Sequence, residues 1–195
     1  MTVESPLAAT EPPQDCQRCP RLVALREECR AQHPDWWNAP VPAFGDPQAR
    51  IAIIGLAPGR QGANRTGRPF TGDYAGDLLF ATLARYGLAE GRYDARPDDG
   101  LVLKDIIIIN SVKCLPPQNK PEPAEIHNCR PFLADAVAAL PHARTFIALG
   151  QIAHQSAVKI LGGKLPKARF VHLAEHRMPD GRVLIDSYHC SRYNQ

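Results

Sequence analysis

The stretch IAIIGLAPGRQGANRTGRPFTGDYAGD, residues 51–77, decides the fold. It opens with the apolar, β-branched run Ile51–Ile54, which is typical of a buried strand. Gly55 ends this run, and a glycine-rich loop continues from there to Asp73, where a helix is expected to begin. A buried strand that leads through such a loop into a helix commonly surrounds a ligand in an open α/β sheet. Long irregular loops inside compact domains also tend to carry function, so the sequence predicts a ligand site here.

Two common phosphate-binding signatures are excluded at this loop. A dinucleotide fingerprint needs a glycine two residues after Gly55, and Ala57 stands there. A P-loop needs Lys and then Ser or Thr after its second glycine, but Gly67 is followed by Arg68 and Pro69. The loop instead carries side chains suited to phosphate, a planar base or acid–base chemistry: Asn64, Arg65, Arg68 and Asp73.

Composition places the chain among ordinary globular proteins. Its 195 residues suit one domain, and 44% of them are hydrophobic and 22% charged. No apolar stretch is long enough for a membrane span, and the N-terminus lacks the pattern of a signal peptide, so we expect a cytoplasmic protein. Six cysteines without an export signal favour metal or redox use over disulfides. The net charge of +3 permits a polyanionic partner without requiring one.

The rest of the chain alternates strand and helix signals. Residues 1–15 are polar and rich in proline, and we expect a loose tail followed by a single domain over residues 16–195. Pro131 is expected to kink or split the helix that contains it. This β-loop-α alternation predicts the α/β class, with a mainly parallel sheet covered by helices on both faces. The expected helices are 20–32, 121–140 and 151–161, and the further strands are 106–109, 144–149, 168–173 and 182–186.

The ends of the predicted strands should meet in one cleft, because ligands of such sheets bind outside the carboxyl ends of the strands. The first strand leads into the glycine-rich loop, and the others end near Asn110, Gly150 and His189. Phe70 in the loop suits either the core or a platform on which a planar base stacks. Lys113 and Arg192 suit either solvent or a phosphate. His189 and Ser191 are candidate site residues only because the strand ends are expected to converge.

Four of the cysteines form a candidate metal site. Cys16 and Cys19 have the Cys-x-x-Cys spacing that lets two thiolates bind one metal ion or cluster, whereas Cys114 and Cys129 are more widely spaced. Zinc ribbons favour a second Cys-x-x-Cys pair, and this unequal spacing with adjacent prolines fits a [4Fe-4S] cluster better. We expect the remaining Cys29 and Cys190 to be free.

In their order along the chain, these motifs resemble the uracil-DNA glycosylase superfamily, most closely its family 5 (type B) branch of iron–sulfur enzymes. The resemblance extends over about residues 16–194. Leu56 stands where family 4 enzymes carry an acidic residue, which matches the type B pattern, and Cys190 replaces the proline of the usual His-Pro-Ser. The residues that carry the resemblance are Cys16-x-x-Cys19, Gly55–Gly59, Gly62–Asp73, Asn110–Cys114, Cys129 and His189-x-Ser191-x-x-Asn194.

The resemblance implies an α/β/α sandwich with a [4Fe-4S] cluster. Its activity would be base excision repair, in which the N-glycosidic bond of uracil and of other deaminated bases, such as hypoxanthine and xanthine, is hydrolysed after base flipping. Relatives continue beyond the position of Gln195, so we expect a chain truncated at its C-terminus. The implied partner is damaged DNA, in duplex or single-stranded form, and the protein is expected to act as a monomer without a membrane.

The resemblance also implies a role for each site residue. Asn110 would hydrogen-bond the base edge, Phe70 would stack on the base, and His189 would donate to the carbonyl oxygen of the departing base. Asp73 would orient the attacking water or stabilise the oxocarbenium-like sugar, because Asp46 precedes the first strand and Asp77 lies in the following helix. The other implied substrate contacts are Gly55, Ala57, Asn64, Ser191 and Asn194. The implied DNA contacts are Arg65, Arg68, Lys113 and Arg192, with Arg192 or Tyr193 near the gap in the duplex, and the cluster ligands are Cys16, Cys19, Cys114 and Cys129.

Two other functions fit the same residues. A non-catalytic DNA-lesion binder would keep the cluster and the cleft but not turn over. A nucleotide hydrolase would act on free nucleotides without DNA.

Overall fold

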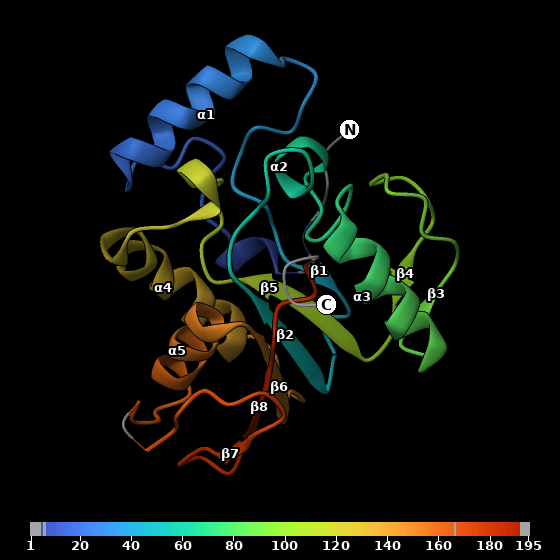
Figure 1. The fold of residues 1–195 in the computed structure, drawn as a ribbon, viewed down its shortest axis with the longest axis vertical. Helices are drawn as coiled ribbons and strands as arrows, with labels where there is room; N and C mark the ends of the chain where they lie inside the picture. The colour runs from blue at the N-terminus through green and yellow to red at the C-terminus, as the bar shows by residue number, and fades with distance from the viewer. Residues whose placement is uncertain (1–4, 6, 166, 192–195) are drawn as a thin grey trace.

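A six-stranded sheet forms the centre of the computed structural model, which describes residues 5, 7–165 and 167–191 (Figure 1). The strand order is β1-β5-β2-β6-β8-β7. The four inner strands are mutually parallel, and the two edge strands β1 and β7 run antiparallel to their neighbours. The strands are β1 (Phe44–Gly45), β2 (Ile51–Gly55), β5 (Ile106–Asn110), β6 (Thr145–Leu149), β7 (Glu175–Arg177) and β8 (Val183–Ser187), with β3 (Ala89–Glu90) and β4 (Val102–Leu103) in a separate two-stranded sheet.

Helices cover both faces of the sheet, so the predicted three-layer α/β/α arrangement is confirmed (Figure 1). Helices α4 and α5 pack on one face, and α3 packs on the other. Helix α1 lies beyond the end of the sheet (Figure 1). The helices are α1 (Pro20–Gln32), α2 (Ala63–Thr66), α3 (Tyr74–Arg85), α4 (Pro123–Ala138) and α5 (Gln151–Ile160), with the 3₁₀ helices η1 (Ala8–Thr10) and η2 (Pro117–Asn119).

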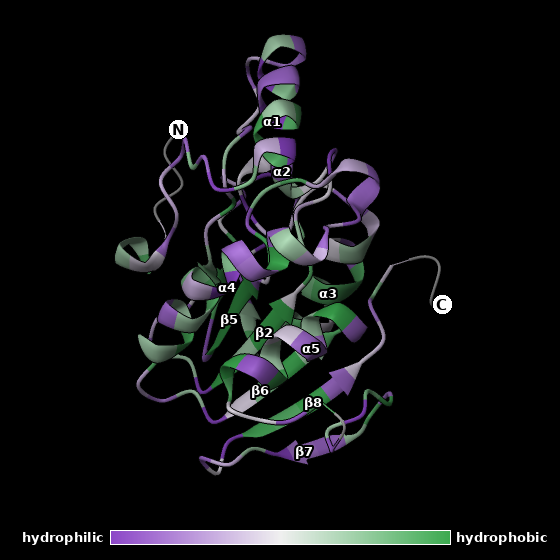
Figure 2. Cartoon of the chain, turned by 90° about the vertical axis from the view of Figure 1, so that its left-hand side faces the viewer, coloured by the Kyte–Doolittle hydropathy of each residue, from purple (hydrophilic) through white to green (hydrophobic). Residues whose placement is uncertain are grey.

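The alternation of side chains along the inner strands builds the two cores. In β5, Ile107 and Ile109 face the α4–α5 layer, whereas Ile106 and Ile108 face α3. All four are fully buried. Because successive strand residues point to opposite faces, a strand buried on both faces reads as an unbroken apolar run. Figure 2 shows this as the green colour of β2 and β5, whose arrows point towards the end of the molecule that carries α1 and α2.

Three expectations differ from the structure. Residues 168–173 were expected to form a strand, but the strand that pairs with β8 is β7, and residues 168–173 form no strand. The expected loose tail is packed at residues 7–11, where Leu7 is buried in the core and Glu11 accepts a 2.7 Å hydrogen bond from the Ala43 amide. Helix α4 runs as one element through Pro131.

No helix in the described part of the chain is long and apolar enough to cross a membrane.

Candidate functional site

The carboxyl ends of β2 and β5 lie side by side, as predicted. Gly55 and Asn110 are register partners at the last position of the two strands. Beyond them, the Ser111 amide and hydroxyl both donate to the Gly55 carbonyl at 2.9 Å, which ties the two strand ends together. A side chain at Gly55 would overlap Asn110 Oδ1 and approach the Phe70 ring to 3.2 Å. Glycine at this position therefore makes the room in which Asn110 and Phe70 meet.

Asn110 is a buried residue whose side-chain amide the described part of the protein does not use. Asn110 is only 3% exposed, yet no hydrogen bond joins its side-chain amide to any other group in the described ranges. Buried polar groups are nearly always hydrogen-bonded. An unpaired amide at the end of a strand is therefore suited to a ligand that offers both a donor and an acceptor.

His189 lies next to Phe70. The two rings are stacked, with centroids 5.9 Å apart and planes 28° from parallel. His189 follows the end of β8, and its Cβ lies 3.9 Å from where a Cβ on Gly150 would stand, so the turn after β6 borders the same place. Burial lowers the pKa of His189, and the nearby Asp73 carboxylate acts in the opposite direction. The imidazole is thus biased towards the neutral form, which still carries one N–H donor.

Asp73 sits at the start of α3 and faces the glycine-rich loop. Its Oδ1 accepts a 3.2 Å hydrogen bond from the Gly76 amide and so caps the helix. Its Oδ2 lies against Gly62, where any side chain would overlap it, and close to Gly59. The electrostatic effect of Asp73 on His189 places the two groups near one another. The structure therefore gathers Gly55, Phe70, Asp73, Asn110 and His189 at the carboxyl edge of the sheet.

Tyr93 holds the backbone on which these groups depend, and it was not among the site residues predicted from the sequence. Its hydroxyl accepts from the Gly72 amide at 3.1 Å and donates to the Phe70 carbonyl at 3.3 Å. Phe70 has a positive φ of 54°, a conformation that is uncommon for a bulky residue and needs support. Tyr93 lies between β3 and β4, and its signal in the sequence is an aromatic residue within a charged stretch.

Two of the predicted DNA contacts, Arg68 and Lys113, have side chains that are buried in ion pairs. Arg68 is 2% exposed, and its guanidinium binds the Asp99 carboxylate through two hydrogen bonds of 2.8 and 2.7 Å. Burial would raise the pKa of Asp99, but Arg68 and two main-chain amides lower it to about 2. Lys113 is 1% exposed, and its Nζ lies 2.8 Å from Glu11 Oε2. Neither cation is available to a phosphate.

The remaining predicted site residues have mixed surroundings. Asn64 is buried, and its amide donates to Asn38 Oδ1 at 2.9 Å, so it fastens the loop to the segment that follows α1. Arg65 is exposed, and its Nε donates to the Gln61 carbonyl. Ala57 and Ser191 are half-buried. Arg192, Tyr193 and Asn194 lie outside the described residues.

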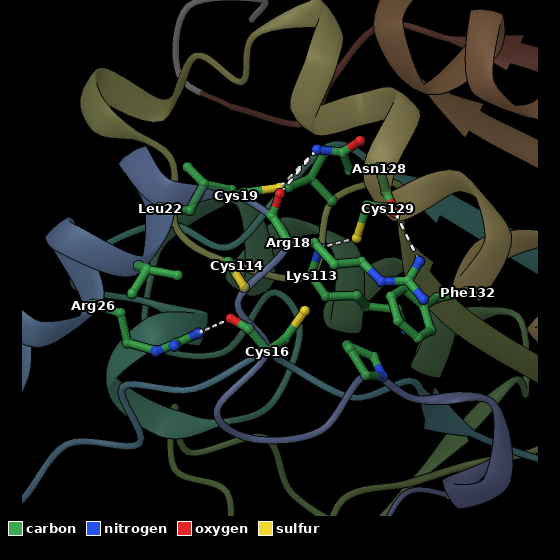
Figure 3. A pocket seen from close by; sticks show the side chains of 13 residues that line it. Cys16, Arg18, Cys19, Leu22, Arg26, Lys113, Cys114, Asn128, Cys129 and Phe132 are labelled. Carbon is green, nitrogen blue, oxygen red and sulfur yellow. Dashed lines mark hydrogen bonds between the residues drawn. The ribbon is translucent and has the colours of Figure 1, made fainter.

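The four candidate metal ligands line one pocket. Cys16 and Cys19 come from the segment before α1, Cys114 follows β5, and Cys129 lies in α4 (Figure 3). Two of the sulfurs accept hydrogen bonds: Cys129 Sγ from the Lys113 amide at 3.3 Å, and Cys19 Sγ from Asn128 Nδ2 at 3.7 Å.

The chemistry of these four thiols suits either a single metal ion or an iron–sulfur cluster. Tetrahedral zinc with Zn–S bonds near 2.3 Å needs its sulfurs about 3.8 Å apart. Among the described residues, no three of the cysteine sulfurs lie within 4.8 Å of one another. In an iron–sulfur cluster each thiolate binds a different iron, so the ligand sulfurs stand further apart. Burial raises the pKa of the Cys114 thiol to about 12 and that of Cys129 to about 11, so both need a strong positive partner to act as thiolates.

Arg26 contributes charge to the same pocket. It is 4% exposed, and its Nη1 donates to the Cys16 carbonyl at 3.1 Å. Its Nε and Nη2 are buried without a hydrogen-bond partner in the described structure. Two unpaired guanidinium donors beside four thiols fit a bound group that is rich in sulfur and carries negative charge.

A second group of potential metal ligands, His154, His176 and Asp186, is better explained as structure. Asp186 is fully buried and accepts from His154 Nδ1 at 2.6 Å, His176 Nε2 at 2.8 Å and the Val171 amide at 3.1 Å. The other ring nitrogen of His154 bonds the Ala168 carbonyl at 2.8 Å. Each of these groups has a partner, so the network needs no ion. It anchors β8, which leads to His189 three residues after Asp186.

The amino-acid sequence matches known proteins over most of its length. The family model described as "Uracil DNA glycosylase superfamily" matches residues 42–195. A type-5 uracil-DNA glycosylase of Thermus thermophilus is 44% identical over 92% of this chain and 84% of its own. One of Mycobacterium bovis is 42% identical over 92% of this chain and 70% of its own. A third, of Pyrobaculum aerophilum, is 39% identical over 92% and 80% of the two chains.

Proposed function

The chain belongs to the uracil-DNA glycosylase superfamily and to its type-5 branch, and on this premise we propose that it removes uracil, and other deaminated bases, from DNA. The observation that carries the proposal is the buried, unpaired amide of Asn110 beside the Phe70 ring. A base extruded from the duplex supplies both a flat face for the ring and a polar edge for the amide.

The chemistry of the amide favours a particular set of bases. Asn110 can accept a hydrogen bond through Oδ1 and donate one through Nδ2. Uracil presents an N–H donor beside a carbonyl acceptor, and hypoxanthine and xanthine present the same pair. Cytosine and adenine present the reverse order, an acceptor nitrogen beside an amino donor. A fixed amide therefore accepts the deaminated bases together and disfavours cytosine and adenine.

Cleavage requires stabilisation of charge on both sides of the breaking bond. The glycosidic electron pair leaves with the base, and the N–H of neutral His189 donates to the base carbonyl oxygen on which that charge accumulates; one preorganised donor of this kind contributes roughly 3 kcal/mol. Asp73 orients a water molecule towards the anomeric carbon of the sugar and accepts its proton as the new C–O bond forms. The lowered pKa of His189 supports this assignment, because it favours the neutral ring, which still carries one N–H donor.

A single-turnover assay with a labelled U·G duplex tests the proposal. Asp73→Asn keeps an oxygen that can cap α3, yet it should slow uracil release by about a hundredfold or more, the scale of lost general-base help. Asp77→Asn is the matched control, because Asp77 is exposed one turn further along α3. Asp77→Asn should release uracil at the wild-type rate. Wild-type protein that binds the duplex but releases no base would instead be a lesion binder.

The same assay tests the wider substrate range. Duplexes that carry hypoxanthine or xanthine should be cleaved, and Asn110→Ala should reduce release of all three bases together. If Asn110→Ala lost uracil release alone, Asn110 would not be the residue that recognises all three bases. Binding should be strongest to duplex DNA, with single-stranded DNA also accepted, and the protein is proposed to act as a monomer.

We further propose that Cys16, Cys19, Cys114 and Cys129 hold a [4Fe-4S] cluster. When bound, the cluster supplies a rigid link between the segment before α1, α4 and the segment that follows Asn110. The spacing of the sulfurs and the unpaired donors of Arg26 support it. Purified protein should be brown and contain iron and acid-labile sulfide. Stoichiometric zinc without either would contradict the cluster.

A further inference from the structure

Arg26 is a buried cation of the cysteine pocket, and two of its donors have no hydrogen-bond partner among the described residues. It projects from α1 into the pocket, with its guanidinium on the side of Cys16 and Cys114 (Figure 3). One of its nitrogens bonds the Cys16 carbonyl, while Nε and Nη2 have no hydrogen-bond partner among the described residues. A buried guanidinium with unmet donors is unfavourable unless a ligand completes it.

The other cations around the pocket differ from Arg26. Lys113 is neutralised by Glu11 at 2.8 Å. Arg18 is exposed, lies over the Phe132 ring and bonds the Asn128 carbonyl, so water screens its charge. The acidic group nearest to Arg26 is Glu27, whose carboxylate is 3.7 Å from Nε and whose side chain is 55% exposed. Arg26 therefore contributes the buried, weakly compensated positive charge of this pocket.

We propose that Arg26 is the charge and hydrogen-bond partner of the iron–sulfur cluster and that it sets the cluster's reduction potential. This inference depends on the cluster proposed above. Four thiolates give the loaded site a net negative charge, and each added electron increases it. A buried cation that donates N–H groups to sulfur stabilises the electron-rich state more than the electron-poor one, so it raises the potential. The same contacts slow the loss of the cluster.

The experiment compares loaded wild-type protein with Arg26→Met, Arg26→Lys and Arg18→Met. The potential is measured by protein-film voltammetry, and cluster loss is followed as bleaching of the visible absorption in the presence of a chelator. Arg26→Met removes the charge and all the donors at similar length, so its potential should fall. Bleaching should be at least about tenfold faster, the lower end of what removing an outer-shell partner costs in metal affinity. Arg26→Lys keeps the charge and should lie between Arg26→Met and wild type.

Arg18→Met is the matched control, because Arg18 borders the same pocket from the solvent side and should change both readouts much less than Arg26→Met does. A loaded Arg26→Met protein with wild-type potential and wild-type bleaching would overturn the inference while leaving the cluster in place. Wild-type protein without iron and sulfide would overturn both. If Arg26→Met does not fold, Arg26→Lys provides the test. A reduction potential of Arg26→Lys equal to that of wild type would show that the donor geometry of Arg26 is irrelevant. That result would overturn the hydrogen-bonding part of the inference. Uracil release by loaded wild-type protein is scored separately, so failure of the activity is distinguished from failure of the inference.

Discussion

At the scale of single residues, glycine at position 55 sets the shape of the base pocket. A methyl group there would overlap Asn110 Oδ1 and press on the Phe70 ring at 3.2 Å. Gly55→Ala should therefore push the amide away from its reading position while β2 remains paired with β5. Because displacements of about 1 Å at a reacting group can cost a hundredfold, we expect a loss of that order in single-turnover uracil release. An unchanged rate in a folded Gly55→Ala protein would place the base elsewhere.

The titration of His189 reports on its surroundings without any turnover. Burial lowers its pKa, and Asp73 partly opposes that shift. In a pH series followed by NMR, the ring should titrate below its ordinary value of about 6.5. Asp73→Asn should lower the pKa of His189 further, because the opposing charge is gone, whereas Asp77→Asn should have a smaller effect. A higher pKa in Asp73→Asn would contradict the closeness of the two groups.

This shift also links stability to pH. A histidine whose pKa is lower in the folded state binds a proton more readily when unfolded. The free energy of unfolding should therefore decline as pH falls below about 6.5 and level off once the folded protein is protonated as well. His189→Gln should weaken that dependence, as measured by urea denaturation at several pH values.

At the scale of elements, the loop before α3 is held to the β3–β4 connection by the pair of Arg68 and Asp99. Removing one partner of a buried pair leaves the other charge uncompensated, so Arg68→Met should lower the free energy of unfolding by about 3–5 kcal/mol. Arg65→Met is the contrasting variant from the same loop. Arg65 is exposed, so its loss should weaken DNA binding and leave stability nearly unchanged. The reverse pattern in urea melts and binding titrations would restore Arg68 as a phosphate contact.

Elements differed in how well the sequence predicted them, and the reason is packing. Strands β2 and β5 are buried on both faces, so their apolar runs predicted their positions to within one residue. Strand β7 is an edge strand of sequence Glu-His-Arg, and nothing in that composition indicates a strand. Its place is decided by pairing with β8 and by the bond from His176 to Asp186.

The site was predicted where chain order alone brings residues together. Strand ends in a parallel sheet meet at one edge, so Asn110, His189 and the glycine-rich loop could be placed in one cleft. The burial of Arg68 and Lys113 could not be foreseen, because their partners Asp99 and Glu11 are 31 and 102 residues away in the sequence. An arginine in a loop looks the same in a sequence whether it faces phosphate or a buried carboxylate.

At the scale of the whole molecule, the small net charge restricts how DNA is bound. With Arg68 and Lys113 occupied by internal carboxylates, fewer cations remain for the DNA backbone than the sequence suggested. Affinity for a uracil duplex should still fall as salt rises, because each neutralised phosphate releases counterions. Fluorescence anisotropy over a range of salt concentrations gives the slope, and Arg65→Met should make it shallower by about one unit. A salt-independent affinity would contradict a backbone contact.

The short segment from Asn110 to Cys114 joins the residue proposed to recognise the base to a ligand of the proposed cluster. Four residue steps span at most about 14 Å, so neither end moves far without the other. Binding of the proposed cluster and formation of the proposed base pocket are then coupled during folding. Protein produced under iron starvation should consequently fail to bind a uracil duplex specifically, rather than bind it without releasing uracil.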